Sequence, residues 1–530
     1  MTKRGKICLI ALLVLELFVL IYFGYQKKGM HFDEFFSYFN TNDSFGREAY
    51  DRSWVTSENI KKDFYVLPGE GFNYGRVITL QSYDVHPPFY YILLHTVCSF
   101  MPGVYSMWQG IGLNILLALL ILVFLYLIID HFAKDEILSL LSLLCIILNP
   151  GFISNVMFIR MYMLLTLWFV IQVYVHLLMS SYEDLSKMPK RYVIISAVVT
   201  YLGFLTHYYY LVFLFFLELG FFAFRLKKIK TEFMTELVYF GSLLLSGVMG
   251  VITFPACLGQ VNSGYRGVEV KGYLTDLSDL GDRLRFFGGL VGRFVLNGIG
   301  VLIFILLILF AVTAYYRSKS IKYDKKMMVE FFCCAVIPVL GFFVFSAKGS
   351  LIGDEAMMRY QLPVYPLIIF IILVTVYSCI RFGFENNKKL SDILRVSIAL
   401  IFIISDIFSL FKGEVFYLYP EQGSYKQIAT EHSEETCMYI YNSEYNKYFI
   451  WSDADQLWQY DKIYFADFEN KDEIVDPAIN SADKLIVYIS KLNGQDSPDE
   501  YIDMIKRSDP KVTSYEKLYE TTYATAYEFY

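Results

Sequence analysis

Long apolar stretches alternate with short polar ones along the first 412 residues of the chain. A membrane-spanning helix needs about 20 apolar residues, and eleven stretches approach or exceed that length. They lie near residues 7–25, 107–130, 137–157, 160–180, 192–206, 208–224, 235–257, 296–315, 327–347, 360–380 and 391–412. The apolar run 89–101 is too short to span and predicts a helix at the membrane surface. The pattern therefore predicts an α-helical polytopic membrane protein with about eleven crossings.

Clusters of basic residues orient these predicted helices, because lysine and arginine accumulate in cytoplasmic loops. The clusters are Lys187/Lys190/Arg191, Arg225/Lys227/Lys228/Lys230, Arg317/Lys319/Lys322/Lys325/Lys326 and Arg381/Lys388/Lys389. With eleven crossings, every cluster falls on the cytoplasmic side, together with the N-terminus. No small-residue cleavage site follows the first apolar stretch, which indicates an uncleaved helix rather than a signal peptide.

Two polar parts stand out on the opposite, extracytoplasmic side. One is the loop 26–88, and the other is the tail that begins at residue 413. The tail contains 23 acidic and 10 basic residues and has a net charge of −13. Strand-like runs at 437–441, 462–465, 484–489 and 524–530, with a helical stretch at 498–506, predict a small α/β domain. We therefore expect a transmembrane domain, 1–412, that includes the loop 26–88, and an acidic extracytoplasmic domain, 413–530.

Composition narrows the possible classes of protein. The chain is 56% hydrophobic and 18% charged, with a net charge of −6. So few polar side chains could not coat a soluble enzyme of this length, and the charge does not indicate a nucleic-acid-binding surface. The eight cysteines show neither zinc spacing nor a disulfide framework.

Several chemically versatile side chains fall on the extracytoplasmic side of this topology. They are Asp33 and Glu34 after the first helix, Asp84 and His86 before the surface helix, Arg160 and Tyr162, His207, and Arg359 and Tyr360. Each alone has a structural explanation, such as an aromatic or arginine anchor at the interface. Their common location indicates a site. Within the membrane, Glu16 and Glu218 are the main ionisable residues, and each is either functional or paired between helices.

These residues resemble the motifs of GT-C membrane glycosyltransferases, in particular the bacterial relatives of protein O-mannosyltransferases and aminoarabinose transferases. The segment D-E-F-F-S at 33–37 is similar to their D-E-x-x-S signature, and H-P-P-F-Y-Y at 86–91 to H-P-P-x-Y-Y. R-M-Y at 160–162, T-H-Y-Y at 206–209, and Arg359-Tyr360 with Pro363 and Pro366 follow in the family's order. One position departs from the pattern, because Phe158 stands where relatives often carry glutamate.

The resemblance implies transfer of a sugar from a polyprenyl-phosphate carrier, with no nucleotide-sugar pocket. We expect Asp33 to accept the proton of the acceptor hydroxyl in an inverting displacement, with Glu34 positioning the loop or assisting the base. Arg160 and Arg359 are expected to bind the phosphate. His86 and His207 would hydrogen-bond the phosphate or orient Asp33, and Tyr162 and Tyr360 belong to the same donor-binding set.

Three questions stay open at this point. The mechanism requires no cofactor; if a divalent metal binds, Asp84, His86 and His207 are the ligand-type residues on that face. The acceptor is a protein, a lipid or a glycan. The sequence does not identify the donor sugar. A transporter or flippase of lipid-linked sugars is the alternative function, although it would place its site near the bilayer midplane. A membrane receptor that is not an enzyme would leave the extracytoplasmic residues unexplained.

Overall fold

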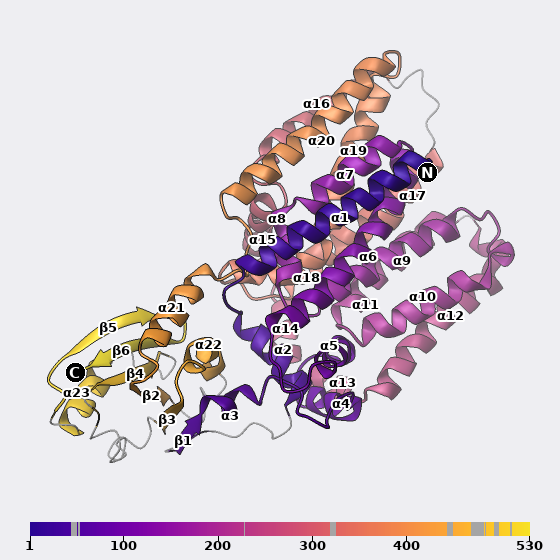
Figure 1. Cartoon of the computed structure of the whole chain (residues 1–530). Coiled ribbons are helices and arrows are strands. Elements are labelled where there is room, and N and C mark those ends of the chain that lie inside the picture. The colour runs from indigo at the N-terminus through magenta and orange to yellow at the C-terminus, as the bar shows by residue number, and fades with distance from the viewer. Residues whose placement is uncertain are drawn as a thin grey trace. The chain divides into compact units, whose positions relative to one another are not determined.

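The computed structural model describes residues 1–43, 50, 53–226, 228–317, 325–441, 449–467, 482, 484–491, 498–508 and 511–530. Three residues of the predicted basic clusters, Lys227, Lys319 and Lys322, lie outside the described residues. The chain forms two compact units (Figure 1). The helical unit contains residues 1–24, 78–93 and 110–416, and the α/β unit contains residues 25–77, 94–109 and 417–530.

The helical unit contains the predicted membrane helices. Among the described residues, seven helical segments are long and apolar enough to cross a membrane. They are α1 (Lys3–Gln26), α6 (Met107–Ala133), α9 (Tyr162–Ser180), α12 (Ile229–Thr253), α17 to α18 (Lys325–Phe331 and Ile337–Lys348, joined by the π-helical turn η3, Phe332–Val336), α19 (Tyr365–Gly383) and α20 (Lys388–Phe411). The pair α7 (Glu136–Ile147) and α8 (Pro150–Met157), bent by 55°, counts as an eighth if it is one span.

The remaining predicted crossings form shorter helices: α10 (Lys190–Phe204), α11 (Tyr209–Arg225) and α16 (Gly300–Arg317). Each of the eleven predicted stretches is therefore helical, while the number of crossings stays a prediction. The surface run forms α5 (Phe89–Ser99), which follows α4 (Tyr74–Ser82). Four further helical segments link the long helices: α13 (Ala256–Asn262), α14 (Tyr265–Thr275), α15 (Leu280–Phe294) and the 3₁₀ turn η4 (Glu355–Tyr360).

The long helices pack in pairs that include α10 with α12, α11 with α18, and α16 with α19 (Figure 1). Gly220 of α11 allows its close approach to η3, because a Cβ there would overlap the carbonyl group of Cys333. Of the two intramembrane glutamates, Glu218 accepts a hydrogen bond from Tyr239 at 2.8 Å and lies 2.9 Å from His176 Nε2. It thus joins α9, α11 and α12. Glu16 is fully buried, and neither of its carboxyl oxygens has a hydrogen-bond partner among the described residues.

The α/β unit is built on a six-stranded sheet with the order β1-β3-β2-β4-β6-β5. The strands are β1 (Ser53–Thr56), β2 (Thr436–Tyr441), β3 (Lys462–Asp467), β4 (Leu485–Ser490), β5 (Tyr515–Glu520) and β6 (Ala524–Phe529). Strands β3, β2 and β4 run parallel, and the other pairs are antiparallel. The four predicted strands and the predicted helix, α23 (Pro498–Ser508), are confirmed, whereas β1 and β5 escaped the sequence analysis.

The edge strand β1 comes from the loop that the sequence-based division assigned to the transmembrane domain. It pairs with β3, so that Ser53 lies opposite Phe465 and Thr56 lies opposite Lys462. The same unit contains α2 (Phe32–Asn42), α3 (Ser57–Lys61), α21 (Pro420–Glu431), the 3₁₀ turn η6 (Phe449–Asp453) and α22 (Ala454–Leu457). By its contacts, much of the first loop therefore belongs with the C-terminal part of the chain.

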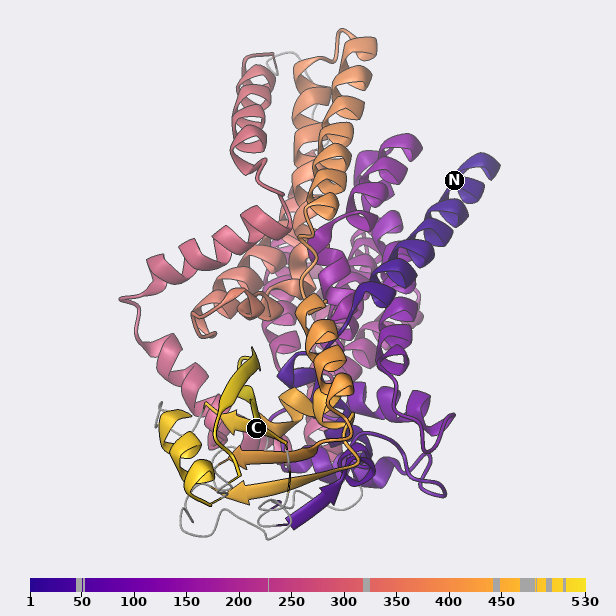
Figure 2. The same ribbon diagram turned by 60° about the vertical axis from the view of Figure 1, so that its left-hand side comes forward.

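Alternation along the strands gives this sheet two apolar faces. Met438 and Ile440 of β2 belong to a buried cluster with Ile502 and Ile505 of α23, the yellow helix beside the strands in Figure 2. Tyr439 lies on the opposite face. Its hydroxyl donates a hydrogen bond to Asp453 Oδ2, at the end of η6, at 2.8 Å. Because both faces are covered, the central strands are almost entirely apolar.

Candidate active site

Three of the predicted site residues of the helical unit lie at breaks between helices. His86 precedes α5, Arg160 lies between α8 and α9, and His207 lies between α10 and α11. The proline pair after His86 is typical of an extended segment before a helix. At the C-terminal end of α8, the carbonyl groups of Val156 and Phe158 accept hydrogen bonds from the Asn114 amide at 3.0 and 2.9 Å, which satisfies backbone groups at the break.

Direct hydrogen bonds tie two of these breaks together. The backbone N–H of Phe89 donates to the carbonyl group of Leu205 at 2.9 Å. The indole N–H of Trp168 donates to the hydroxyl of Thr206, also at 2.9 Å. The H-P-P segment and the T-H-Y-Y segment, which are far apart in the sequence, are thereby neighbours.

The aromatic and imidazole rings of these motifs form one continuous set. The His207 ring lies 5.5 Å from that of His86, 5.9 Å from that of Tyr162 and 5.1 Å from that of Tyr209. The Tyr209 ring lies 6.4 Å from that of Tyr360, and the Arg359 guanidinium lies over the Tyr360 ring at 5.2 Å. The structure therefore brings together five predicted residues: His86, Tyr162, His207, Arg359 and Tyr360. We call these five residues, with Arg160, the donor set.

His207 is held as a neutral imidazole. Its Nδ1 accepts the backbone N–H of Tyr209 at 3.0 Å, so the proton of the neutral ring resides on Nε2. Burial lowers the pKa of His207 to about 3, and the positive charge of Arg160 contributes to this shift. At physiological pH the side chain can therefore donate one hydrogen bond from Nε2 without carrying a charge.

The two predicted arginines are both buried. Arg160 is 5% exposed and Arg359 is 8% exposed. A guanidinium remains charged in such surroundings and presents several N–H donors in one plane, which suits the oxygens of a phosphate group. The donor set thus combines two permanent positive charges with a neutral hydrogen-bond donor, an arrangement able to bind an anion.

Asp84 is fixed through its backbone by a residue that sequence reasoning missed. The side-chain amide of Gln260, in α13, donates to the carbonyl groups of Gln81 and Asp84 at 2.8 Å each. Tyr208 also hydrogen-bonds Gln260. Gln260 therefore connects the segment before α5 with the T-H-Y-Y motif. The sequence contains no signal for this role, because it depends on tertiary contacts of a single side chain.

Asp84, His86 and His207, the ligand-type residues in case a metal binds, are not grouped as a metal site would require. Within the described part of the chain, His432, Glu435 and Glu528 of the α/β unit are the three side chains whose ligand atoms lie within 4.8 Å of one another, and Asp84, His86 and His207 form no such set. In addition, the Nδ1 atom of His207 is occupied by a backbone N–H, which leaves a protonated Nε2 rather than a metal ligand.

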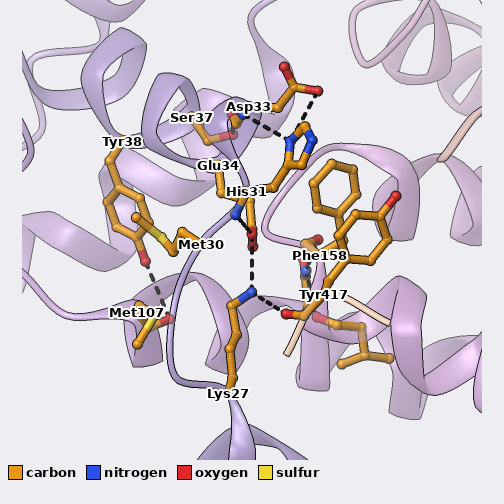
Figure 3. Close-up of polar contacts among 12 residues, drawn as sticks. Lys27, Met30, His31, Asp33, Glu34, Ser37, Tyr38, Met107, Phe158 and Tyr417 are labelled. Atoms are coloured by element: carbon orange, nitrogen blue, oxygen red, sulfur yellow. Dashed lines mark hydrogen bonds and ion pairs between the residues drawn. The ribbon is translucent and has the colours of Figure 1, made fainter. Parts of the chain in front are cut away.

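The two carboxylates of the D-E signature lie in the α/β unit, at the start of α2. His31 is the N-cap, and its backbone N–H donates to Glu34 Oε2 at 2.6 Å. Lys27 Nζ donates to the same oxygen at 3.0 Å (Figure 3). Glu34 is completely buried. It therefore caps the helix and neutralises a buried lysine, which supports the positioning role over assistance to the base.

Asp33 has different surroundings from its neighbour. Its side chain is 24% exposed, and Oδ2 lies 3.6 Å from His31 Nδ1. The same imidazole nitrogen accepts the backbone N–H of Asp33 at 3.1 Å. Figure 3 shows the Asp33 carboxylate directed away from the Glu34–Lys27 pair. Of the two carboxylates, Asp33 is thus the one that is accessible to solvent.

Lys27 and His31 are the residues near the signature that sequence reasoning missed. Lys27 directly follows the last residue of α1 and belongs to no motif of the sequence. His31 stands three residues before Glu34, the spacing of a capping box in which serine or threonine is the usual N-cap. That spacing is the signal that would have identified His31.

The sequence matches no protein-family model and no curated protein. Among solved structures, the chain is similar to ArnT from Cupriavidus metallidurans bound to undecaprenyl phosphate, with a TM-score of 0.51 and 10% identity, over 99% of this chain and 98% of that one. It is also similar to the oligosaccharyltransferase AglB from Archaeoglobus fulgidus in complex with an inhibitory peptide and a dolichol-phosphate, with a TM-score of 0.48 and 12% identity, over 96% and 72%. The chain therefore has the fold of ArnT, and the predicted class, a helical membrane protein with a small α/β part, is confirmed.

Proposed function

We propose that this chain, which shares its fold with a lipid-phosphate-binding membrane transferase, is a glycosyltransferase of the cell membrane. It moves a sugar from a polyprenyl-phosphate carrier to an acceptor on the extracytoplasmic face. In this proposal the N-terminus is cytoplasmic, and the donor set, Asp33 and the C-terminal part lie outside. The observation that carries the proposal is the donor set itself, in which two buried arginines accompany a neutral histidine.

The donor set is proposed to bind the phosphate of the carrier. Arg160 and Arg359 neutralise its charge, and Nε2 of His207 donates a hydrogen bond to one of its oxygens. His86 and Tyr162 contact the His207 ring, and Tyr360 lies beneath the Arg359 guanidinium, so these three side chains adjoin the groups proposed to bind the phosphate. The phosphate is also the leaving group, so the same contacts stabilise the negative charge that grows on it as the bond to the sugar breaks.

Asp33 is proposed to act as the general base. It takes the proton of the acceptor hydroxyl while that oxygen attacks the anomeric carbon. The bond between the anomeric carbon and the phosphate oxygen breaks, and the carrier leaves as polyprenyl phosphate. A single displacement inverts the configuration at the anomeric carbon. Glu34 holds the start of α2 and takes no part in proton transfer.

The first experiment identifies the donor. Mass spectrometry of membrane lipids compares cells that lack the protein with cells that carry the wild type, Asp33→Asn or Asp33→Glu. We expect one polyprenyl-phosphate sugar to accumulate without the protein and with Asp33→Asn, and to disappear with the wild type. An unchanged lipid profile in cells without the protein would overturn the proposal.

The second experiment tests the base with purified protein. The accumulated lipid is the donor probe, and wild-type membranes supply the acceptor. Asp33→Asn is expected to lower kcat by roughly 10²–10⁴-fold, the usual contribution of a general base. Near-normal transfer by correctly inserted Asp33→Asn protein contradicts the base assignment. NMR of the product reports whether the anomeric configuration has inverted.

A further inference from the structure

We infer that Lys27 is a positioning residue for Asp33. The segment 417–422 contributes to the same positioning through its contact with Lys27. The inference rests on the proposed function. Lys27 is fully buried, and its ammonium group donates to two acceptors. One is Glu34 Oε2 at 3.0 Å, and the other is the carbonyl group of Tyr417 at 2.6 Å (Figure 3). A single side chain thus joins the signature helix to a segment 390 residues further along.

Backbone contacts run beside this side-chain link. The N–H of Lys28 donates to the carbonyl group of Leu418 at 2.7 Å. A Cβ on Gly29 would lie 2.6 Å from Cβ of Gln422. Tyr417 and Tyr419 both have positive φ, 63° and 50°, so this segment adopts a conformation that non-glycine residues rarely take. The segments 27–29 and 417–422 therefore fit together closely, and the fit requires glycine at position 29.

The aromatic face of α2 also rests on the C-terminal part. The Phe39 ring lies 4.3 Å from that of Trp451, and the Phe36 ring lies 5.3 Å from it. The Phe35 ring lies 6.3 Å from that of Trp458. Both the cap and the apolar face of α2 are thus held by residues beyond 416. The position of Asp33 on α2 consequently depends on the C-terminal part.

Loss of Lys27 should affect the site more than loss of a single hydrogen bond, because Lys27 also supplies a positive charge. Burial lowers the pKa of Lys27, and the charge of Glu34 opposes this effect, followed by that of Asp455. Burial raises the pKa of Asp455 to about 6, against the charges of Lys426 and Lys27. Without Lys27, the fully buried Glu34 carboxylate loses the positive charge that lies 3.0 Å from it. Its charged form is then less favourable in the buried site, which weakens its bond to the His31 backbone.

The consequence for Asp33 follows from the cap. His31 contacts Asp33 at both the backbone and the carboxylate. When the bond from the His31 N–H to Glu34 weakens, the start of α2 loses its cap and the Asp33 carboxylate shifts. A displacement of about 1 Å lowers a rate by about 100-fold. KM for the donor should stay unchanged, because the phosphate contacts come from the donor set.

The test compares Lys27→Met with Lys28→Met. Lys28 is the matched control, because its ammonium group makes an exposed hydrogen bond to the nearby carbonyl group of Tyr25. The donor probe is the lipid-linked sugar that accumulates in cells without the protein. We expect kcat to fall about 100-fold in Lys27→Met and to stay unchanged in Lys28→Met. Hydrogen exchange of the α2 amides should accelerate in the first variant alone.

Two further variants separate positioning from loss of folding. Lys27→Met/Glu34→Gln removes both charges and keeps an oxygen that can accept the His31 N–H, so it should regain at least about tenfold in kcat over Lys27→Met. Gly29→Ala keeps both charges but forces the two segments apart, and it should reproduce the loss of kcat with KM unchanged. If the Lys27→Met protein does not accumulate in cells, kcat and KM of Gly29→Ala are compared with those of the wild type. Unchanged kcat in Gly29→Ala then contradicts the positioning role.

The outcomes distinguish this inference from the proposed function. If the wild type transfers no sugar, the proposed function is wrong. If the wild type transfers sugar and Lys27→Met and Gly29→Ala both match Lys28→Met in kcat and hydrogen exchange, the positioning role of Lys27 is wrong. A double variant as slow as Lys27→Met also contradicts the argument from charge.

Discussion

Nδ1 of His207 accepts the backbone N–H of Tyr209 at 3.0 Å, and this bond fixes which nitrogen of the ring carries the proton. The pKa of the side chain is lowered to about 3, so the ring stays neutral through the physiological range. In the proposed reaction, the contribution of His207 is therefore one hydrogen bond from Nε2 to the phosphate, independent of pH.

Replacement of His207 tests this role. His207→Gln retains an N–H donor and should keep kcat/KM within about tenfold of wild type, whereas His207→Phe should lose roughly 10²-fold or more. Since the pKa of folded His207 is about 3, the shape of the pH profile between about pH 5 and 8 should be the same in wild type and His207→Gln. If the wild-type rate changes with pH between about pH 5 and 8 and this change is absent in His207→Gln, then the histidine titrates during catalysis.

Arg160 and Arg359 are predicted to be irreplaceable by lysine. Lysine keeps the charge but lacks the planar set of donors that a phosphate can accept from. Arg160→Lys and Arg359→Lys should therefore bind the donor about 10-fold more weakly or worse, a loss of roughly 1.4 kcal/mol or more. Binding of undecaprenyl phosphate to purified protein measures this directly, with Arg285→Lys, whose side chain is highly exposed, as the control.

Asp63 predicts a pH dependence of stability in the α/β unit. It is 9% exposed and accepts a hydrogen bond from Tyr50, and burial together with the charge of Asp43 raises its pKa to about 8. The unfolded carboxyl ionises near a pH of about 4. Between about pH 4 and 8 the unfolded state alone gives up the proton, so the stability that Asp63 contributes falls as pH rises through this range.

Asp63→Asn removes that dependence. The variant should raise Tm by about 2–4 °C near pH ~8.5 and leave it nearly unchanged near pH ~3, where Asp63 is close to neutral in both states. Thermal unfolding followed at the two pH values provides the measurement. An equal change in Tm at both pH values would mean that the carboxyl does not hold its proton in the folded protein.

Glu218 is predicted to be structural. It bonds Tyr239 and His176, so Glu218→Leu deprives each of these two buried polar groups of one partner and should cost about 1–2 kcal/mol. Glu218→Gln keeps an acceptor for Tyr239 and should cost less. The rate of transfer per folded molecule should not change in either variant. A specific loss of transfer with Glu218→Gln, at normal thermal stability, would instead indicate a catalytic or transport role.

Local patterns were sufficient for most of the secondary structure. Apolar length predicted each long helix, and the buried strands β2, β3, β4 and β6 were visible as apolar runs. β1 was missed because four residues, Ser53–Thr56, in a polar loop carry no alternation that distinguishes them from turn. The bend between α7 and α8 had a readable signal, since Asn149 caps α8 and Pro150 begins it.

The candidate site divides in the same way. The motifs identified His86, Tyr162, His207, Arg359 and Tyr360, and the structure places their side chains in one continuous set. The sequence could not assign different surroundings to Asp33 and Glu34, because the difference comes from Lys27 and from the fold of α2. The roles of Lys27 and Gln260 could not be predicted from the sequence, because each contacts a partner that is distant in the sequence.

The pairing of β1 with β3 has a consequence for biogenesis. Ser53 emerges early in synthesis, whereas its partner Phe465 follows after all the membrane helices have been made. Until then β1 is an unpaired edge, a template for aggregation or for attack by proteases. During most of translation, β1 therefore has no partner strand. A chain truncated before β3 should be degraded rather than persist as a stable fragment.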